Sequence, residues 1–218
     1  NMMDTVTGLF GFSAGLERMR ECRRAQPDGV MIDLYLDGLR EAGEKNGIMF
    51  SDMVLEEVGR LIRERCAALS RETGNRAEAL RLNRDELTLW LEGVAAGRGS
   101  AFIKELLATS NGDVWEEAFR VRFRAGLALG DRVGDTEQVI RMARRAQLQA
   151  SVGQRYAFYE DGEDRTALPP VQGCEIHTLD YGEDMSLASV ALNLFAKGAD
   201  FPAQMMLMIC KIGRTYRA

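Results

Sequence analysis

Histidine, paired cysteines and long apolar runs are nearly absent from this 218-residue chain, and each absence excludes a class of protein. The single histidine rules out an HExxH motif and any metal site that needs two histidines. Four cysteines lie far apart and form no CxxC pair, which favours reduced thiols in a cytoplasmic protein. They are Cys22, Cys66, Cys174 and Cys210.

Apolar runs and single-sign charge are also scarce. No run approaches the roughly 20 apolar residues that a membrane helix needs, and the N-terminus has no secretory signal pattern, so we expect no membrane contact. The net charge is only −5 and no long block carries one sign, so nucleic acid is not an expected partner. Arginines between residues 18 and 24 alternate with Glu17 and Glu21, which predicts a solvent-exposed helix face with ion pairs.

Helical periodicity is the main positive signal. Between residues 13 and 158 apolar side chains recur about every 3.6 residues, and no period-2 run indicates a strand. The sequence predicts an all-α fold, either an antiparallel helical bundle or a short array of helical hairpins, with a helical domain over residues 1–158. The expected helices carry Leu16 and Met19, Ile32 to Leu39, Val54 to Leu69, Leu87 to Val94, Phe102 to Leu107, Trp115 to Leu127, and Val139 to about Tyr156.

Capping patterns support several of these helices. Asn83 with Glu86, and Asp113 with Glu116, have the spacing of a capping box, in which two side chains satisfy backbone donors at a helix start. Ser51 is an expected N-cap of the third helix.

The composition changes near residue 160. Eight acidic residues and one basic residue lie between residues 160 and 184, and Pro169-Pro170 excludes a continuous helix there. We predict an irregular acidic segment over residues 159–184. Two C-terminal helices within residues 185–218 are expected to pack on the same core.

Two segments, residues 68–80 and 128–140, align without gaps and predict helix, turn and helix in both copies. The second copy resembles the second half of a tetratricopeptide repeat, with Gly134-Asp135 at its turn and Val139, Ile140 and Ala146 at its later positions. The glycine of that family would fall on Leu127, and no 34-residue period is visible. Small residues at any antiparallel helix crossing explain the match as well. The resemblance implies a groove that binds a peptide or helix of a partner.

One segment could carry catalysis. His177, Cys174 and Asp180 are the candidate acid/base groups, although an extended backbone would turn Cys174 and His177 to opposite faces.

The acidic segment also invites a metal. Asp161, Glu163 and Asp164 are candidate ligands for a hard cation, but EF-hand spacing is missing and turns before helices also favour acidic residues. We therefore expect no metal and no cofactor.

A methionine-dense stretch near the C-terminus indicates either core or a partner-binding surface, through Met205, Met206, Met208 and Ile209. The favoured function is a helical protein-binding module, an adaptor, chaperone or assembly factor without catalytic activity, which binds a protein partner or itself. The alternative is an enzyme of unrecognised type with its site around His177 and residues 160–184.

Overall fold

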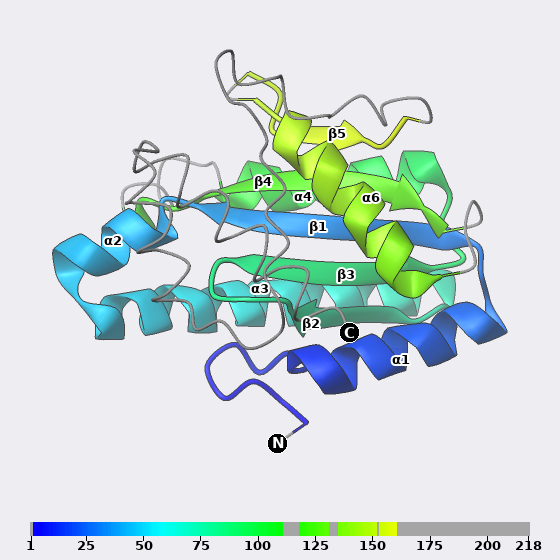
Figure 1. The fold of residues 1–218 in the computed structure, drawn as a ribbon, viewed down its shortest axis with the longest axis horizontal. Coiled ribbons are helices and arrows are strands. Elements are labelled where there is room, and N and C mark those ends of the chain that lie inside the picture. The colour runs from blue at the N-terminus through cyan, green and yellow to red at the C-terminus, as the bar shows by residue number, and fades with distance from the viewer. Residues whose placement is uncertain (1, 111–117, 131–134, 152, 161–218) are drawn as a thin grey trace, which may run out of the picture. The chain divides into compact units, whose positions relative to one another are not determined.

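The computed structural model describes residues 2–110, 118–130, 135–151 and 153–160. The chain divides into two units, Asn1–Glu163 and Asp164–Ala218, and the described residues all belong to the first. At its centre lies a five-stranded sheet in the order β2-β3-β1-β4-β5 (Figure 1). Neighbouring strands are antiparallel except β4 and β5, which are parallel. The strands are β1 (Gly29–Asp37), β2 (Ala77–Arg81), β3 (Glu86–Glu92), β4 (Arg122–Leu129) and β5 (Tyr156–Phe158).

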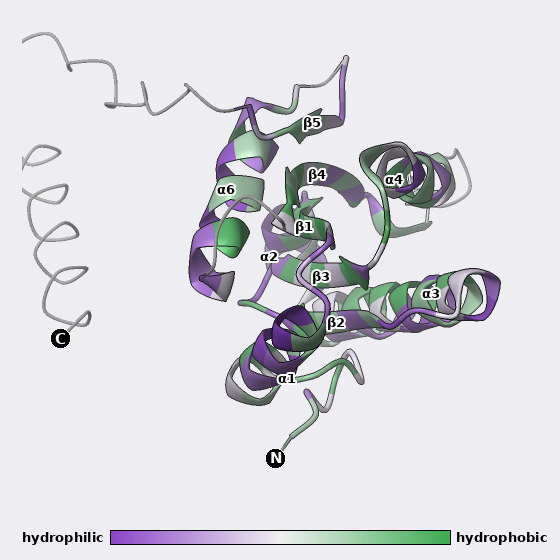
Figure 2. Ribbon diagram, turned by 90° about the vertical axis from the view of Figure 1, so that its right-hand side faces the viewer, coloured by the Kyte–Doolittle hydropathy of each residue, from purple (hydrophilic) through white to green (hydrophobic). Residues whose placement is uncertain are grey.

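Helices cover both faces of this sheet. Viewed with the sheet on edge, α3 and α4 lie on one side and α6 on the other, while α1 lies beside β2 (Figure 2). The side chains of α1 and α6 share one buried cluster, so these two helices cover the same face. The helices are α1 (Phe12–Ala25), α2 (Leu39–Asn46), α3 (Ile48–Thr73), α4 (Ala96–Ser110) and α6 (Thr136–Gln149).

The prediction of an all-α fold is wrong, because a five-stranded sheet with both faces buried forms the centre of the structure. Along β1, Ile32 and Leu34 join the core beneath α3 and α4, whereas Met31 joins the core beneath α1 and α6. Every residue of β3 is buried. The sequence does carry a period-2 signal, because Ile32 to Leu36 of β1 and Leu87 to Leu91 of β3 have an aliphatic residue at every second position. The sequence interpretation overlooked it, since the same residues also fit helical spacing.

Three predicted helices are strands in the structure. The stretch from Ile32 to Leu39 is mostly β1, the stretch from Leu87 is mostly β3, and Phe123 lies in β4. Asn83 and Glu86 do form the predicted contact, with Asn83 Nδ2 donating to Glu86 Oε2 at 2.5 Å. It joins residues of the turn between β2 and β3, so it does not cap a helix. The second predicted capping box, at residues 113 and 116, lies outside the described residues.

The internal repeat is not a structural repeat. Residues 68–80 run from the end of α3 into β2, whereas residues 128–140 run from the end of β4 into α6. Helix precedes strand in one copy and strand precedes helix in the other. The helical-hairpin array and the tetratricopeptide interpretation are therefore wrong.

Four predicted helices are confirmed, with shifted ends. α1 and α4 carry the expected apolar residues, and α3 buries the stripe from Val54 to Leu69. α3 begins at Ile48 rather than at Ser51, and α6 ends before Tyr156, which begins β5. None of the described helices is both long and apolar enough to span a membrane. The acidic segment from residue 161 and the two C-terminal helices fall outside the described residues.

The close approach of α6 to β4 depends on Gly126. A Cβ added at this glycine would collide with the carbonyl oxygen of Ala143 and the backbone nitrogen of Gln147. These atoms belong to the helix backbone, which cannot move aside as the end of a side chain can. Position 126 therefore sets how deeply α6 packs onto the sheet.

Gly126→Ala should lower the free energy of unfolding by about 1–3 kcal/mol, because the methyl group overpacks a helix–sheet contact. Urea unfolding followed by circular dichroism measures the change. Gly97→Ala is the matched control, since a Cβ at this exposed helical glycine meets nothing within 4 Å. A Gly126→Ala variant as stable as Gly97→Ala would contradict the close packing.

Candidate functional site

Polar side chains gather at one end of the sheet face that carries α6. The odd-numbered residues of β1 point to this face, because Met31 lies in the core beneath α1 and α6. Further along, the same face carries Asp33, Tyr35 and Asp37. The face thus changes from apolar to polar towards the end of β1.

The neighbouring strands continue the polar region. Asp33 lies opposite Thr88 on β3, and Tyr35 lies between Glu86 on β3 and Arg124 on β4. We call this region the polar sheet end. Its members are Asp33, Tyr35, Asp37, Asp85, Glu86, Arg124, Arg144 and Arg155.

Asp33 is an uncommon residue for a central strand. Its side chain is 0% exposed, and no described residue donates a hydrogen bond to either carboxylate oxygen. Burial, followed by the charge of Glu86, raises the pKa of Asp33 to about 9. Asp33 is therefore protonated at neutral pH, and a protonated carboxyl can donate a hydrogen bond to Glu86.

Glu86 connects three parts of the fold. It is 3% exposed, and its carboxylate accepts from Asn83 Nδ2 at 2.5 Å and lies 2.9 Å from Arg144 Nε on α6. With protonated Asp33 as a further neighbour, Glu86 joins the β2–β3 turn, the central strand and α6. This pairing allows a carboxylate to remain buried in the sheet.

Tyr35 occupies the centre of the polar sheet end. The guanidinium of Arg124 lies 5.0 Å from the centre of the Tyr35 ring, a cation–π contact. Burial and the negative charges of Asp85 and Asp37 raise the pKa of the Tyr35 hydroxyl. Both carboxylates are therefore close enough to this ring to act on its charge.

Ion pairing and the backbone fix the rim of the site. Arg155 Nη1 lies 3.3 Å from Asp37 Oδ2, and Arg155 Nε donates to the carbonyl oxygen of Phe123 at 3.2 Å. The backbone N–H of Leu36 donates to the carbonyl oxygen of Asp85 at 2.8 Å, which holds the turn against the end of β1.

Gly38 then redirects the chain into α2. Its φ is 91°, and an added Cβ would lie 2.6 Å from the carbonyl oxygen of Arg120. The sharp turn starts α2 directly after Asp37. The first N–H groups of a helix have no partner within the helix and favour anions.

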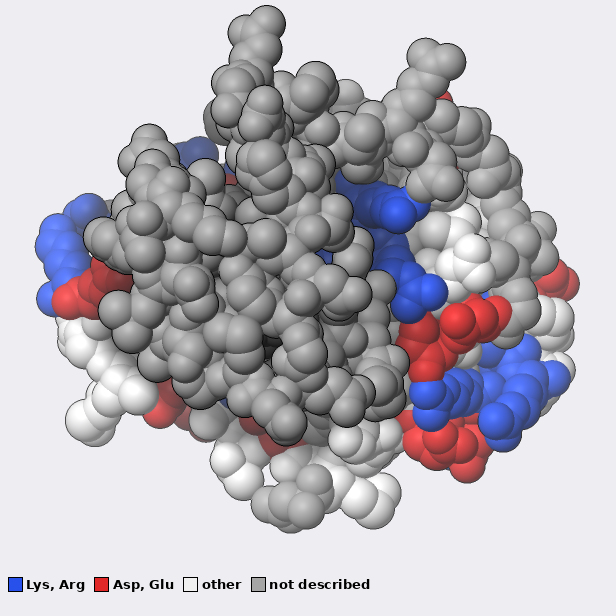
Figure 3. All heavy atoms as spheres, viewed as in Figure 1, with Lys and Arg blue, Asp and Glu red and all other residues white. Residues whose placement is uncertain are grey.

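The arrangement suits an anion better than a metal bound by protein side chains alone. Among the described residues, no three carboxylate, histidine or cysteine side chains come together in a group that could hold a metal ion. Arginines lie on both sides of the carboxylates. Basic side chains also gather over α6 on the face shown in Figure 3, whereas acidic and basic side chains alternate over α1.

The structure does not test the sequence-based site residues. All of them lie outside the described residues: His177, Cys174, Asp180, Asp161, Glu163, Asp164, Met205, Met206, Met208 and Ile209.

No protein-family model and no curated protein sequence matches the chain. Solved structures do match. The GGDEF domain of FimX from Pseudomonas aeruginosa is 18% identical, with a TM-score of 0.61 over 73% of this chain and 99% of that chain. The fold is that of a GGDEF domain. A second example is the GGDEF domain of DgcB from Caulobacter crescentus, solved in complex with c-di-GMP; it is 17% identical, with a TM-score of 0.60 over 73% and 93% of the two chains.

Another match with this fold has a protein partner. Diguanylate cyclase SiaD from Pseudomonas aeruginosa, solved in complex with its activator SiaC, is 24% identical, with a TM-score of 0.56 over 68% of this chain and 57% of that chain. An α/β GGDEF fold shared with a cyclase overturns the prediction of a helical adaptor, chaperone or assembly factor without catalytic activity.

The letters GGDEF spell Gly-Gly-Asp-Glu-Phe, and the dipeptide Asp-Glu occurs once in this chain. It is Asp85-Glu86, at the turn that leads into β3, within Asn83-Arg84-Asp85-Glu86-Leu87. Both glycines and the phenylalanine are replaced. The sequence interpretation missed this turn because Asn83 and Glu86 also fit a helix cap. The turn signal that could have revealed it is the polar stretch from Asn83 to Glu86, which lies between two apolar runs.

Asp33→Asn should remove a pH dependence of stability. The folded state keeps the Asp33 proton up to about pH 9, whereas an unperturbed aspartate has a pKa of 3.8. Ionisation is therefore easier in the unfolded chain, so stability falls as pH rises between these values, by up to about 1.4 kcal/mol per pH unit. Asparagine stays neutral, and the variant should gain stability relative to the natural chain between pH 5 and pH 8.

Urea unfolding at each pH tests this expectation, with Asp28→Asn as the exposed control. Parallel curves for the natural chain and Asp33→Asn would show that Asp33 is already ionised when folded.

Proposed function

We propose that this chain is a nucleotide-binding domain that binds a guanine nucleotide at the polar sheet end. The observation that carries the proposal is the position of Asp85-Glu86, beside the end of β1, in a chain that has the fold of nearly a whole GGDEF domain. One protein with this fold is solved with c-di-GMP, a guanine nucleotide.

Arginines would hold the phosphates. Arg124 and Arg155 lie within the polar sheet end, and Arg84 is exposed on its turn. A guanidinium group presents two parallel N–H donors to phosphate oxygens, which makes arginine the usual residue for this task. The start of α2 adds backbone N–H groups at the same end of β1.

The carboxylates would serve the cation that accompanies a nucleotide. Mg²⁺ in such sites is held by one or two carboxylates together with the phosphates and water. Asp37 and Asp85 are both close enough to Tyr35 for their charges to raise the pKa of its hydroxyl, and they suit this role. The site therefore needs no group of three protein ligands.

GTP and c-di-GMP should each be tested by calorimetric titration of the full chain with Mg²⁺. We expect saturable binding of at least one of them. Arg84→Gln should weaken it about tenfold, because a charge-assisted hydrogen bond to phosphate is lost. Arg60→Gln is the matched control, since Arg60 pairs with Glu57 and Glu64 on the exposed surface of α3. A folded chain that binds neither nucleotide would refute the proposal.

Turnover is a second candidate, favoured by the two carboxylates beside Tyr35. In that case, incubation with GTP in the presence of Mg²⁺ should form c-di-GMP and release pyrophosphate. Asp85→Asn should then lower the rate on the order of 100-fold, because charge stabilisation at the reacting phosphate is lost. GTP binding without product would instead identify a nucleotide sensor. A protein partner or self-association, as in the complex of SiaD with SiaC, stays part of the proposal.

A further inference from the structure

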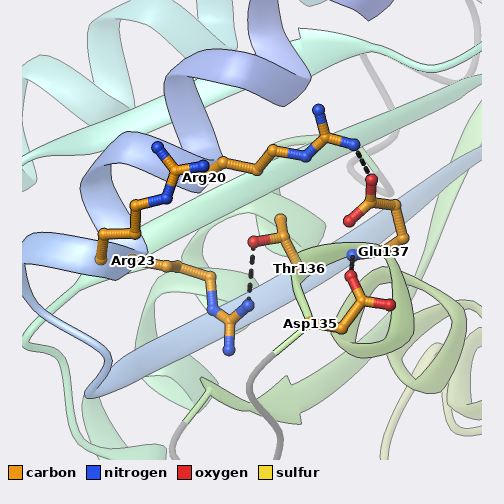
Figure 4. Close-up of a pocket in the computed structure, with 6 residues that line it drawn as sticks. Arg20, Arg23, Asp135, Thr136 and Glu137 are labelled. Atoms are coloured by element: carbon orange, nitrogen blue, oxygen red, sulfur yellow. Dashed lines mark hydrogen bonds and ion pairs between the residues drawn. The ribbon is translucent and has the colours of Figure 1, made fainter.

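A polar pocket lies between α1 and the start of α6 (Figure 4). Its volume is about 230 Å³. Arg23, which forms part of its wall, donates a hydrogen bond to the carbonyl oxygen of Gly130. Gly130 follows the last residue of β4, whereas the polar sheet end lies at the first residues of β4. The pocket is therefore separate from the proposed nucleotide site. It is lined by Arg20, Arg23 and Arg24 from α1 and by Asp135, Thr136 and Glu137 from α6.

Arg23 is held in a fixed orientation. Only 5% of this residue is exposed, and its guanidinium donates to Thr136 Oγ1 at 2.9 Å and to the carbonyl oxygen of Gly130 at 2.8 Å. The guanidinium also lies 5.6 Å from the centre of the Trp90 ring. An arginine fixed in this way loses little conformational entropy when a ligand binds.

The two other arginines are more accessible. Arg20 Nη1 lies 3.1 Å from Glu17 Oε2. The Arg20 guanidinium also contacts the Glu137 carboxylate (Figure 4). Arg24 is exposed and makes no hydrogen bond or ion pair with any described residue. The prediction of a purely solvent-exposed arginine face is thus wrong for Arg23, which forms part of a pocket wall.

The start of α6 adds positive potential. Asp135 caps the helix, and its carboxylate accepts a hydrogen bond from the backbone N–H of Glu137 at 3.1 Å. A helix N-terminus behaves like roughly half a positive charge. Among the described residues that line the pocket, three guanidinium groups and this helix end face two carboxylates, so their net charge is positive.

We propose that this pocket binds the phosphate group of a small ligand. Arg23 and Arg24 would contact the phosphate oxygens, and Glu137 acts as an internal competitor that holds Arg20 while the pocket is empty. Guanidinium groups in different directions around one cavity match the tetrahedral oxygens of phosphate better than a planar carboxylate.

Titration of the full ¹⁵N-labelled chain with inorganic phosphate tests the pocket directly. Backbone N–H resonances of Thr136 and Glu137 should shift saturably, and sodium chloride of the same ionic strength should not reproduce the shift. Arg24→Gln should weaken phosphate binding about tenfold. Arg18→Gln is its matched control, because Arg18 lies on the same helix and pairs with Glu78 outside the pocket.

A substitution of opposite sign makes the test sharper. Glu137→Gln removes one of the two carboxylates that pair with Arg20 and should strengthen phosphate binding, whereas Glu21→Gln removes the same charge from α1 outside the pocket and should not. The proposal is overturned if phosphate shifts no resonance near Thr136, or if the controls change affinity as much as the pocket variants. Shifts confined to the amides of Tyr35 and Asp37 would also overturn it while leaving the proposed nucleotide site intact.

Discussion

Burial of both faces of the sheet is the constraint on which the rest of this structure depends. α3 and α4 cover one face and α1 and α6 cover the other, so β1 and β3 lie almost entirely in the protein interior. A polar side chain in such a strand costs free energy unless it is paired or neutralised. Asp33 and Glu86 are therefore conspicuous exceptions. Both lie near the turn that carries Asp85, within the polar sheet end.

The periodicity of apolar residues explains what the sequence could and could not predict. α3 was predictable because one of its faces meets water, so its apolar residues recur with the helical period. In β1, apolar and polar residues alternate from Ile32 to Asp37, but Ile32, Leu36 and Leu39 also fit helical spacing, so the local pattern did not decide between strand and helix. Strand pairing was equally hidden, since Tyr35 and Arg124 become neighbours only when β4 returns beside β1. The candidate site depends on that pairing.

Local patterns predicted contacts more reliably than elements. Asn83 and Glu86 do meet, because a side chain three residues away is within reach in a tight turn as well as at a helix start. The choice between turn and helix is made by tertiary packing, here by the backbone hydrogen bond from Leu36 to Asp85.

α6 connects the two proposed sites. Its first turn borders the pocket through Thr136 and Glu137, and Arg144, further along the same helix, contacts buried Glu86. Its distance from the sheet is set by backbone contact at Gly126. A shift of this helix would therefore be felt at both places, which gives the fold a direct route for coupling them.

The hydrogen bond between Leu36 and Asp85 has a consequence for how this chain can vary in length. Side chains alternate between the faces of a strand, so one residue inserted into the turn and absorbed by β3 would exchange the faces of every following side chain. Glu86 would then face the apolar core beneath α3 and α4, away from Arg144, and Leu87 would face α6. The length of this short connection is therefore as restricted as its composition, and insertions are better tolerated where loops do not determine a register.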